Sequence, residues 1–188
     1  YMVDKTLSKV CEGKTPSEIL DISVADIACG SGIFLEEAFA YLQDYCVQWY
    51  ICNGQTDHLI ETGIDLYKLP LQEKKDILCS CIYGIDIDIH AVEVAKFSLL
   101  IKLIEDETAP SVSEVVPILP DLGDNIQFGN SLVSQTELNG ISGANHQMME
   151  IAPFDWSTIN NGCGFDVIIG NPPYVNTEGM HALSLIHI

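Results

Sequence analysis

The sequence predicts an α/β fold built on a doubly wound, mostly parallel sheet. Four short β-branched runs are spread along the chain, and helical patterns follow the first two of them. Strands that alternate with helices are typical of a parallel sheet, because each crossover helix returns the chain to the same edge. The chain can also bury a core, since 47 % of its 188 residues are hydrophobic. This composition excludes a disordered or collagen-like chain.

The first strand is predicted at residues 22–27, with a helix on either side of it. The first ten or so residues place apolar side chains among polar ones, and Gly13 is suited to end that helix. After the strand, Ala28-Cys-Gly-Ser-Gly32 predicts a glycine turn, and apolar residues at helical spacing predict a helix from Phe34 to Trp49. Because a helix occupies the very first residues, we expect the chain to begin inside a longer protein.

The second strand is predicted at residues 82–87, and a long excursion separates it from the first. The excursion, residues 52–81, is predicted as irregular in its first half and as a helix from Leu71 to Cys81. Asp88 is placed to cap the next helix, which is expected to run to about Glu105. This excursion is therefore an insertion in an otherwise regular strand and helix alternation.

The third and fourth strands are predicted at residues 126–128 and 165–169. Residues 134–164 are rich in Asn, Gly, Ser and Gln, which indicates an irregular insertion and not a second domain. Gly170-Asn-Pro-Pro-Tyr174 must leave the fourth strand, because two prolines cannot continue a central strand. We therefore expect one partial domain over residues 1–182, truncated after its fourth strand.

Two further expectations concern the end of the chain. Val167, Ile168 and Ile169 are expected to lie near an exposed sheet edge, a state prone to association. Residues 183–188, Leu-Ser-Leu-Ile-His-Ile, are expected not to be native protein. They match a translation of the transposon-end adapter that is used in sequencing libraries.

Charge and cysteine content exclude several classes of protein. Eight Lys+Arg residues face 27 Asp+Glu, so the net charge is −19, and a surface of this sign repels DNA phosphate. No stretch reaches eighteen apolar residues without a charge, and the N-terminus has no basic region followed by an apolar one, so we expect neither a membrane span nor a signal peptide. Seven cysteines without a Cys-x-x-Cys pair indicate reduced thiols in a cytoplasmic protein. Neither they nor the histidines have the spacing of a metal site, so we expect no metal.

Two features at the ends of the first two strands favour a nucleotide-like ligand. Gly30 and Gly32 let the backbone approach such a ligand without a Cβ in the way. Leu35 stands where the dinucleotide fingerprint needs a third glycine or alanine, which counts against NAD or FAD. Asp86 ends the second strand, where a carboxylate can accept two hydrogen bonds from a ribose diol. The alternatives at this point are that the glycines form a tight turn without a ligand and that Asp86 is an ordinary carboxylate at the end of a strand.

The tetrapeptide Asn171-Pro172-Pro173-Tyr174 carries the most specific chemistry. The Asn171 amide oxygen and the Pro172 carbonyl are two adjacent acceptors that can bind both hydrogens of an exocyclic amine. This arrangement makes the amine nitrogen a better nucleophile toward a methyl group, and the prolines fix the carbonyl direction. Tyr174 can stack on the ring that bears the amine, which suits an extruded base. The alternative is a proline turn beside a packed tyrosine.

Four motifs in order give the chain a family resemblance: Asp26-Ile-Ala-Cys-Gly-Ser-Gly-Ile-Phe-Leu35, Tyr83-Gly-Ile-Asp-Ile-Asp88, Gly129-Asn-Ser-Leu132 and Asn171-Pro-Pro-Tyr174. Over about residues 1–180 the chain resembles the gamma-class adenine-N6 DNA methyltransferases. It is most similar to the fused type IIG restriction–modification and phage-exclusion (BREX-like) members. The resemblance implies a Rossmann-like fold and S-adenosylmethionine as the cofactor.

The resemblance also implies a role for each matching residue. Asp26 and the turn Ala28, Gly30 and Gly32 are expected to hold the methionine part of the cofactor. Asp86 is expected to take its ribose hydroxyls. Ile87 and Asn130 are expected to contact the adenine of the cofactor, and Pro173 is expected to flank the cofactor. The target adenine in double-stranded DNA is expected to be bound by Asn171, Pro172 and Tyr174.

Other functions share some of these residues. Glutamine-amide methyltransferases of release factors and RNA guanine-N2 methyltransferases also use Asn-Pro-Pro-Tyr, but the insertion at 52–81 favours the DNA enzyme. A non-catalytic, cofactor-binding partner subunit is an alternative of another class. We expect DNA contacts to come from a recognition domain that this chain lacks, so the chain alone is expected to be inactive.

Overall fold

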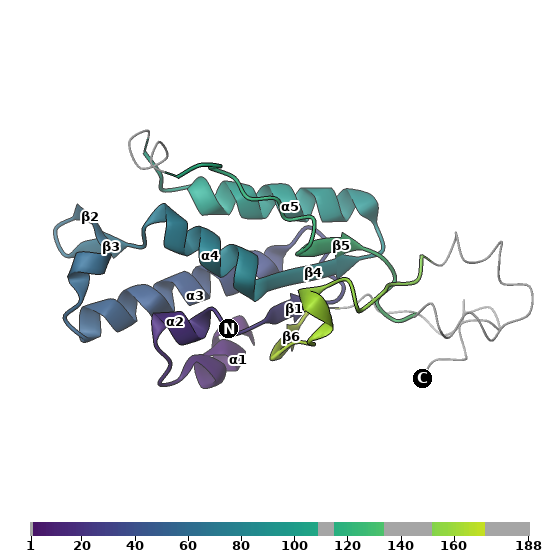
Figure 1. Ribbon diagram of the computed structural model, residues 1–188, viewed down its shortest axis with the longest axis horizontal. Helices are drawn as coiled ribbons and strands as arrows, with labels where there is room; N and C mark the ends of the chain where they lie inside the picture. Colours follow the sequence, from purple (N-terminus) through teal and green to yellow (C-terminus); the bar gives the residue numbers. More distant parts are fainter. Residues whose placement is uncertain (1, 109–114, 134–151, 172–188) are drawn as a thin grey trace, which may run out of the picture.

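The computed structural model describes residues 2–108, 115–133 and 152–171 (Figure 1). Pro172, Pro173, Tyr174 and the tail at 183–188 lie outside the described residues. The helices and strands in chain order are α1 (Met2–Cys11), α2 (Pro16–Ile19), β1 (Val24–Asp26), α3 (Ile33–Cys52), η1 (Thr56–His58), β2 (Ile60–Gly63), β3 (Leu66–Lys68), α4 (Leu71–Cys81), β4 (Ile82–Asp86), α5 (Ile89–Ile104), β5 (Ile126–Phe128), η2 (Asn160–Gly162) and β6 (Val167–Ile169).

The main sheet has four strands in the order β5-β4-β1-β6, and all its neighbouring strands run parallel. Val24 of β1 pairs with Ile82 of β4 on one side and with Val167 of β6 on the other. The chain thus starts in the middle of the sheet, builds outward through β4 and β5, and returns to the opposite side of β1. This confirms the predicted doubly wound α/β fold, and all four strands end at one edge.

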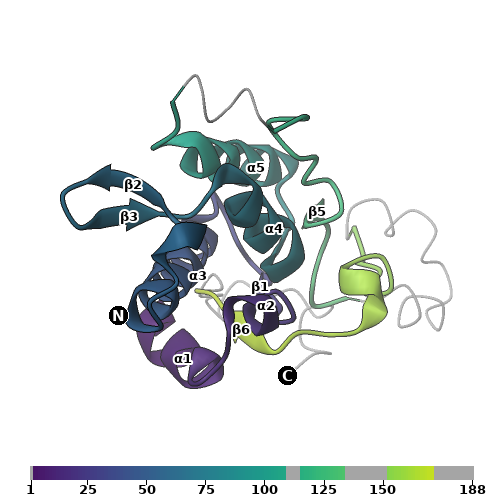
Figure 2. The same ribbon diagram turned by 60° about the vertical axis from the view of Figure 1, so that its left-hand side comes forward.

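The two faces of the sheet are covered differently. The helices α1, α3, α4 and α5 lie on one side of the sheet (Figure 2), and their side chains form the larger core with the strands. The other face carries a smaller core in which Ala25, Tyr83 and Ile85 pack against Phe154 and Ile159. Successive residues of a strand point to opposite faces of the sheet. The predicted strands therefore contribute side chains to both cores.

A glycine in β4 lets α3 lie close to the sheet. A Cβ at Gly84 would stand 2.7 Å from Cδ1 of Leu35 and 3.1 Å from Sγ of Cys29. Leu35 is fully buried in the first turn of α3. The absence of a side chain at Gly84 therefore fixes how closely the start of α3, and the turn before it, approach the strand.

Several elements in the first half of the chain were not predicted, among them a short helix and a hairpin. Thr15 and Glu18 form a capping box that starts α2, a short helix before β1. In the excursion, which the sequence predicts as irregular up to residue 69, β2 and β3 form an antiparallel hairpin at the end of the molecule away from the sheet (Figure 1). The predicted helix over residues 71–81 is confirmed as α4.

A buried cluster of charges ties the excursion to the rest of the molecule. Glu107, just after α5, bonds to Lys68 of β3 at 3.1 Å and to Lys74 of α4 at 2.6 Å. The Glu107 side chain is 1 % exposed and that of Lys74 is 5 % exposed. One carboxylate therefore holds the hairpin and α4 against the end of α5.

The fourth strand differs from its prediction in one respect. Ile168 is exposed, but Val167 and Ile169 are buried, because their side chains join the larger core. The expected exposed apolar edge is thus limited to one of the three residues. None of the helices in the described part of the chain has the length and apolar character needed to cross a bilayer.

Candidate functional site

The predicted site residues that the structure describes meet at the edge where the parallel strands end. Asp26 ends β1 and Asp86 ends β4. Asn130 follows β5 by two residues, and Asn171 follows β6 by two residues. Ligands of doubly wound sheets bind at this edge, near the point where the strand order reverses. Residues that lie up to 145 positions apart along the chain are therefore candidates for a single site.

The glycine turn is held by β4. Gly30 N–H donates to Oδ2 of Asp86 at 2.7 Å, and Cys29 N–H donates to the carbonyl of Ile85 at 3.0 Å. Gly30 has φ +53, and a Cβ there would meet no atom within 4 Å. The space in front of Gly30 is thus open, and its backbone conformation favours glycine.

Gly32 joins the turn to α3 and packs against α5. Its φ is +88, and a Cβ there would lie 3.1 Å from Cβ of Ala95. Both the conformation and the close approach favour glycine. The small residue at Ala95 lets α5 press against the turn, so the turn is supported from β4 and from α5.

Asp86 is already engaged with the backbone. Its second oxygen, Oδ1, accepts a hydrogen bond from Asp88 N–H at 2.9 Å. A carboxylate has about four lone-pair positions, so two remain for a ligand. Asp88 caps α5 by accepting from His90 N–H at 2.9 Å, as predicted.

Asp26 is the most unusual residue of the site. It is 1 % exposed, and its Oδ1 accepts a hydrogen bond from Ala28 N–H at 3.0 Å. Its Oδ2 is buried and has no hydrogen-bond partner in the described structure. Burial raises the pKa of Asp26, the Ala28 hydrogen bond lowers it, and the charge of Asp86 raises it further. A buried carboxylate oxygen without a partner needs a donor or a cation to stabilise its charge.

The turn after β5 is tied to the turn after β1. Ser131 Oγ donates to the carbonyl of Ile27 at 2.7 Å. Asn130 accepts a hydrogen bond from Leu132 N–H at its Oδ1, at 3.1 Å. Ile87, the residue after β4, is 56 % exposed. An acceptor oxygen and an exposed aliphatic side chain are therefore present at positions where the sequence predicts contacts with an adenine.

Gly170 connects β6 to the site and was not predicted as a site residue. A Cβ at this position would stand 2.6 Å from Oδ1 of Asp26, so the backbone before Asn171 lies directly against the Asp26 carboxylate. Asn171 itself is exposed. A glycine between a strand and an Asn-Pro pair is a signal in the sequence, but its contact with Asp26 depends on the pairing of β6 with β1.

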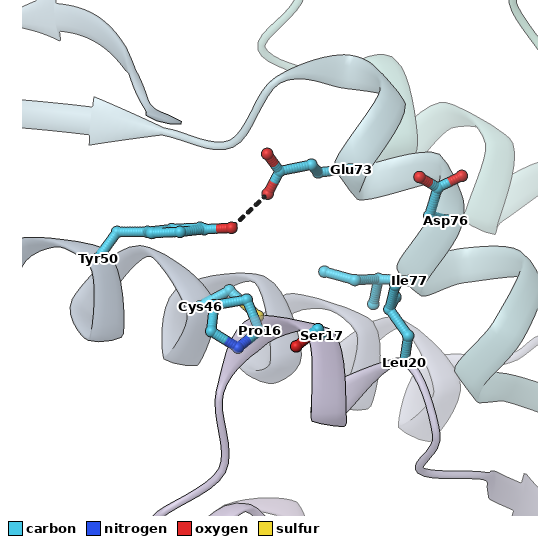
Figure 3. Close-up of a pocket in the computed structure, with 8 residues that line it drawn as sticks. All are labelled: Pro16, Ser17, Leu20, Cys46, Tyr50, Glu73, Asp76 and Ile77. Carbon is cyan, nitrogen blue, oxygen red and sulfur yellow. Dashed lines mark hydrogen bonds between the residues drawn. The ribbon is translucent and has the colours of Figure 1, made fainter. Parts of the chain in front are cut away.

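A cavity away from the strand edge also contains carboxylates beside a phenol (Figure 3). A cavity of 190 Å³ between α2, α3 and α4 has Tyr50 Oη donating to Glu73 at 3.3 Å. Burial raises the pKa of both groups, that of Tyr50 to about 12. Tyr50 is near the end of α3 that lies about 25 Å from the glycine turn, at 1.5 Å per residue. This cavity therefore contains none of the predicted site residues.

The chemistry of the strand edge fits a cationic nucleoside and not a phosphate. None of the ion pairs among the described residues involves Asp26 or Asp86. Two carboxylates without a paired cation repel a pyrophosphate and attract an ammonium or a sulfonium. No group of three or more His, Cys, Asp or Glu side chains in the described residues could hold a metal ion. A ligand similar to S-adenosylmethionine, which carries both cations, fits this pair of carboxylates.

Comparisons with known proteins point to restriction–modification methylases. Residues 80–186 match the sequence model of the family described as Eco57I restriction-modification methylase. The chain is 43 % identical over 183 residues, 97 % of its length, to the type II restriction enzyme and methyltransferase RM.Eco57I of Escherichia coli. It is 34 % identical over 137 residues, 70 % of its length, to the putative type II restriction enzyme and methyltransferase RM.MjaORFECS2P of Methanocaldococcus jannaschii. The matched regions are 17 % and 11 % of these two relatives.

Proposed function

Because the chain belongs to the Eco57I restriction-modification methylase family, we propose that it binds S-adenosylmethionine and carries the acceptor site of an adenine-N6 DNA methyltransferase. The observation that supports this most directly is the meeting of Asp26, Asp86 and Asn130 at one sheet edge, with Asn171 at the end of the neighbouring strand. The proposed role is restriction–modification or phage defence.

The cofactor is proposed to lie across the ends of β1, β4 and β5. Asp86 accepts hydrogen bonds from the ribose hydroxyls through the lone pairs that Gly30 and Asp88 leave free. Ile87 lies against the adenine of the cofactor, and Asn130 accepts from its amino group. Asp26 and the turn Ala28, Gly30 and Gly32 hold the methionine part, with Pro173 at its flank. When bound, the cofactor supplies an electrophilic methyl group.

The target adenine is proposed to lie beyond the end of β6. Asn171 and the carbonyl of Pro172 accept the two hydrogens of its amino group and so hold the nitrogen lone pair toward the methyl group. Tyr174 stacks on the extruded base. The backbone of Gly170 lies against Asp26, which supports an acceptor site next to the cofactor site.

Double-stranded DNA is the proposed partner, and its phosphates are proposed to be bound outside these 188 residues. The charge of −19 works against phosphate contacts by this chain. All seven cysteines are free thiols, which supports the proposed cytoplasmic location.

The test uses the full reading frame that encodes this chain. The purified protein is incubated with tritiated S-adenosylmethionine and duplex DNA, and the DNA is digested to nucleosides. We expect label in N6-methyladenine, and we expect Asn171→Ala to abolish it while cofactor binding survives. Asn53→Ala, at the far end of α3, serves as the control and should retain activity.

Three results would contradict the proposal. Label in a cytosine derivative would exclude adenine as the target. Label in a release factor or in RNA guanine, offered as competing substrates, would favour the glutamine-amide or guanine-N2 reaction. A loss of cofactor affinity in Asn171→Ala equal to the loss of rate would contradict a role toward the target amine.

A further inference from the structure

The outward side of α5 is apolar. Val94, Phe97 and Ile101 are 49 %, 65 % and 47 % exposed, although side chains of these types are usually buried. The inward side of the same helix supplies four fully buried residues to the larger core. Figure 1 and Figure 2 both show α5 at the outer edge of the group of helices. A helix that is apolar on both sides is normally buried on both, so we expect the outward side to be covered.

The exposed residues have the spacing of a contact between two helices. Val94, Phe97, Ile101 and the partly buried Ile104 are separated by three, four and three positions. Alternating steps of three and four repeat about every 3.5 residues, which is the period of the seam between two packed helices. We call these four residues the outer stripe of α5. Its period indicates that the partner is a second α-helix with an apolar stripe of its own.

The charges that flank the outer stripe are already paired. Glu93 and Glu105 lie on its two sides, because successive helical residues are rotated by about 100°. Glu93 pairs with Lys96 at 3.1 Å, and Glu105 pairs with Lys102 at 2.6 Å. These two pairs are neutral, although the net charge of the chain is −19. The surface along the outer stripe therefore favours an apolar partner and not a basic one.

The size of the outer stripe distinguishes a second copy of the chain from a tethered segment. Since a whole buried aromatic side chain covers about 150–250 Å², the half-exposed residues of the stripe offer on the order of a few hundred Å². A stable complex between free molecules buries about 800 Å² on each partner. Two copies would also bring together two net charges of −19, which repel each other. A helix in the same polypeptide needs less area, because the tether gives it a high effective concentration.

We propose that the outer stripe of α5 is the docking site for an amphipathic helix from another part of the same polypeptide. In the relative RM.Eco57I the matched region is 17 % of the length, so the rest of such a protein is long enough to supply this helix. The proposal goes beyond the proposed function and does not depend on it, because the ligand contacts proposed above lie at the strand ends.

The first test identifies the occupant by photocrosslinking in the protein from the full reading frame. p-Benzoylphenylalanine takes the place of Phe97, and peptide mass spectrometry locates the crosslink that irradiation produces. We expect a crosslink to a peptide of the same polypeptide outside these 188 residues, with no product of doubled mass on a denaturing gel. The control carries the same group in place of Ile64, which is 92 % exposed at the hairpin, and should give no crosslink to that peptide.

The second test measures how completely the outer stripe is covered. In the full protein, Phe97→Cys should react with an alkylating reagent at least about tenfold more slowly than the same variant unfolded in urea, because the docked helix must first release. Ile64→Cys is the control and should react at its unfolded rate. Ile101→Cys repeats the measurement at a second position of the stripe, and it decides the question if Phe97→Cys does not fold.

Three results would overturn the proposal. Labelling of Phe97→Cys and Ile101→Cys at the unfolded rate would show that solvent reaches the outer stripe in the full protein. A crosslinked product of doubled mass would show that a second copy covers it. A crosslink to a peptide within these 188 residues would show that the partner lies in this chain itself.

Discussion

At the scale of single residues, Asp86 combines two roles in one carboxylate. It holds the glycine turn through Gly30 and its own loop through Asp88. The sequence predicts only the contact with ribose, because the hydrogen bond to Gly30 spans 56 positions and depends on the pairing of β1 with β4. Losing the carboxylate should therefore affect the ligand and the turn together.

We predict that Asp86→Ala weakens cofactor binding by about 2–4 kcal/mol, because two charge-assisted hydrogen bonds are lost and water recovers part of their free energy. Calorimetry on the protein from the full reading frame measures this change. Asp124→Ala removes an exposed carboxylate near β5 and should leave the affinity as it is. An unchanged affinity in Asp86→Ala would show that the ribose lies elsewhere.

Some site residues could be predicted from a short local motif, and others only from contacts between distant parts of the chain. Asp26, Asp86 and Asn130 stand inside short motifs, and the structure puts them at one edge as strand ends. Gly170 and Ser131 were missed, since their importance lies in contacts with Asp26 and Ile27 across the sheet. Only the strand order creates these contacts. The predicted roles of Pro172, Pro173 and Tyr174 stay predictions, as these residues lie outside the described part of the chain.

At the scale of elements, the buried strands were predictable and the peripheral ones were not. β1, β4, β5 and β6 lie in short β-branched or apolar stretches bounded by turn residues, and such stretches carry a strong signal. The β2–β3 hairpin is half-buried or exposed along its length, so it lacks that pattern. The capping box at Thr15 and Glu18 was present in the sequence as Thr-x-x-Glu and could have predicted α2.

The hairpin and α4 depend on the cluster of Lys68, Lys74 and Glu107. We predict that Lys74→Met lowers the free energy of unfolding by about 3 kcal/mol, because Glu107 loses its closest buried partner and removing one partner of a buried ion pair is costly. Urea denaturation monitored by circular dichroism measures this loss.

The matched control for that prediction is Lys96→Met. Lys96 pairs with Glu93 on the surface of α5, and the Glu93 side chain is 64 % exposed. Exposed pairs of this kind contribute about 0–1 kcal/mol. If Lys74→Met is no more damaging than Lys96→Met, the cluster does not stabilise the excursion.

At the scale of the whole molecule, acidic charge dominates. Burial raises the pKa of Asp26, Asp44 and Glu73. A carboxyl group whose pKa is higher in the folded state adds stability at low pH, and this contribution is lost as pH rises through that pKa. Asp166 behaves oppositely, because hydrogen bonds from Ser23 lower its pKa. Its contribution to the stability of the fold is lost only as pH falls below the ordinary pKa range of Asp.

We therefore predict that the chain becomes more stable as pH falls from about 7 to about 5. Added salt should stabilise it at pH 7, since screening reduces the self-repulsion of a net charge of −19. Thermal unfolding across this pH range, with and without salt, measures both effects. A melting temperature that falls steadily on acidification from pH 7 would contradict the assignment of these three groups.

The buried thiol of Cys29 also makes it possible to measure how often the glycine turn opens. Cys52 and Cys163 are exposed, so an alkylating reagent should modify them at once. Cys29, with a pKa of about 12 and a place beneath Gly84, can react only when the turn lifts from β4 and the thiol meets water. Its labelling rate, followed by mass spectrometry, thus counts the opening events of the turn. A ligand that bridges the turn and Asp86 should slow the labelling of Cys29 by the factor 1 + L/Kd, where L is the free ligand concentration. The labelling of Cys52 and Cys163 should not change.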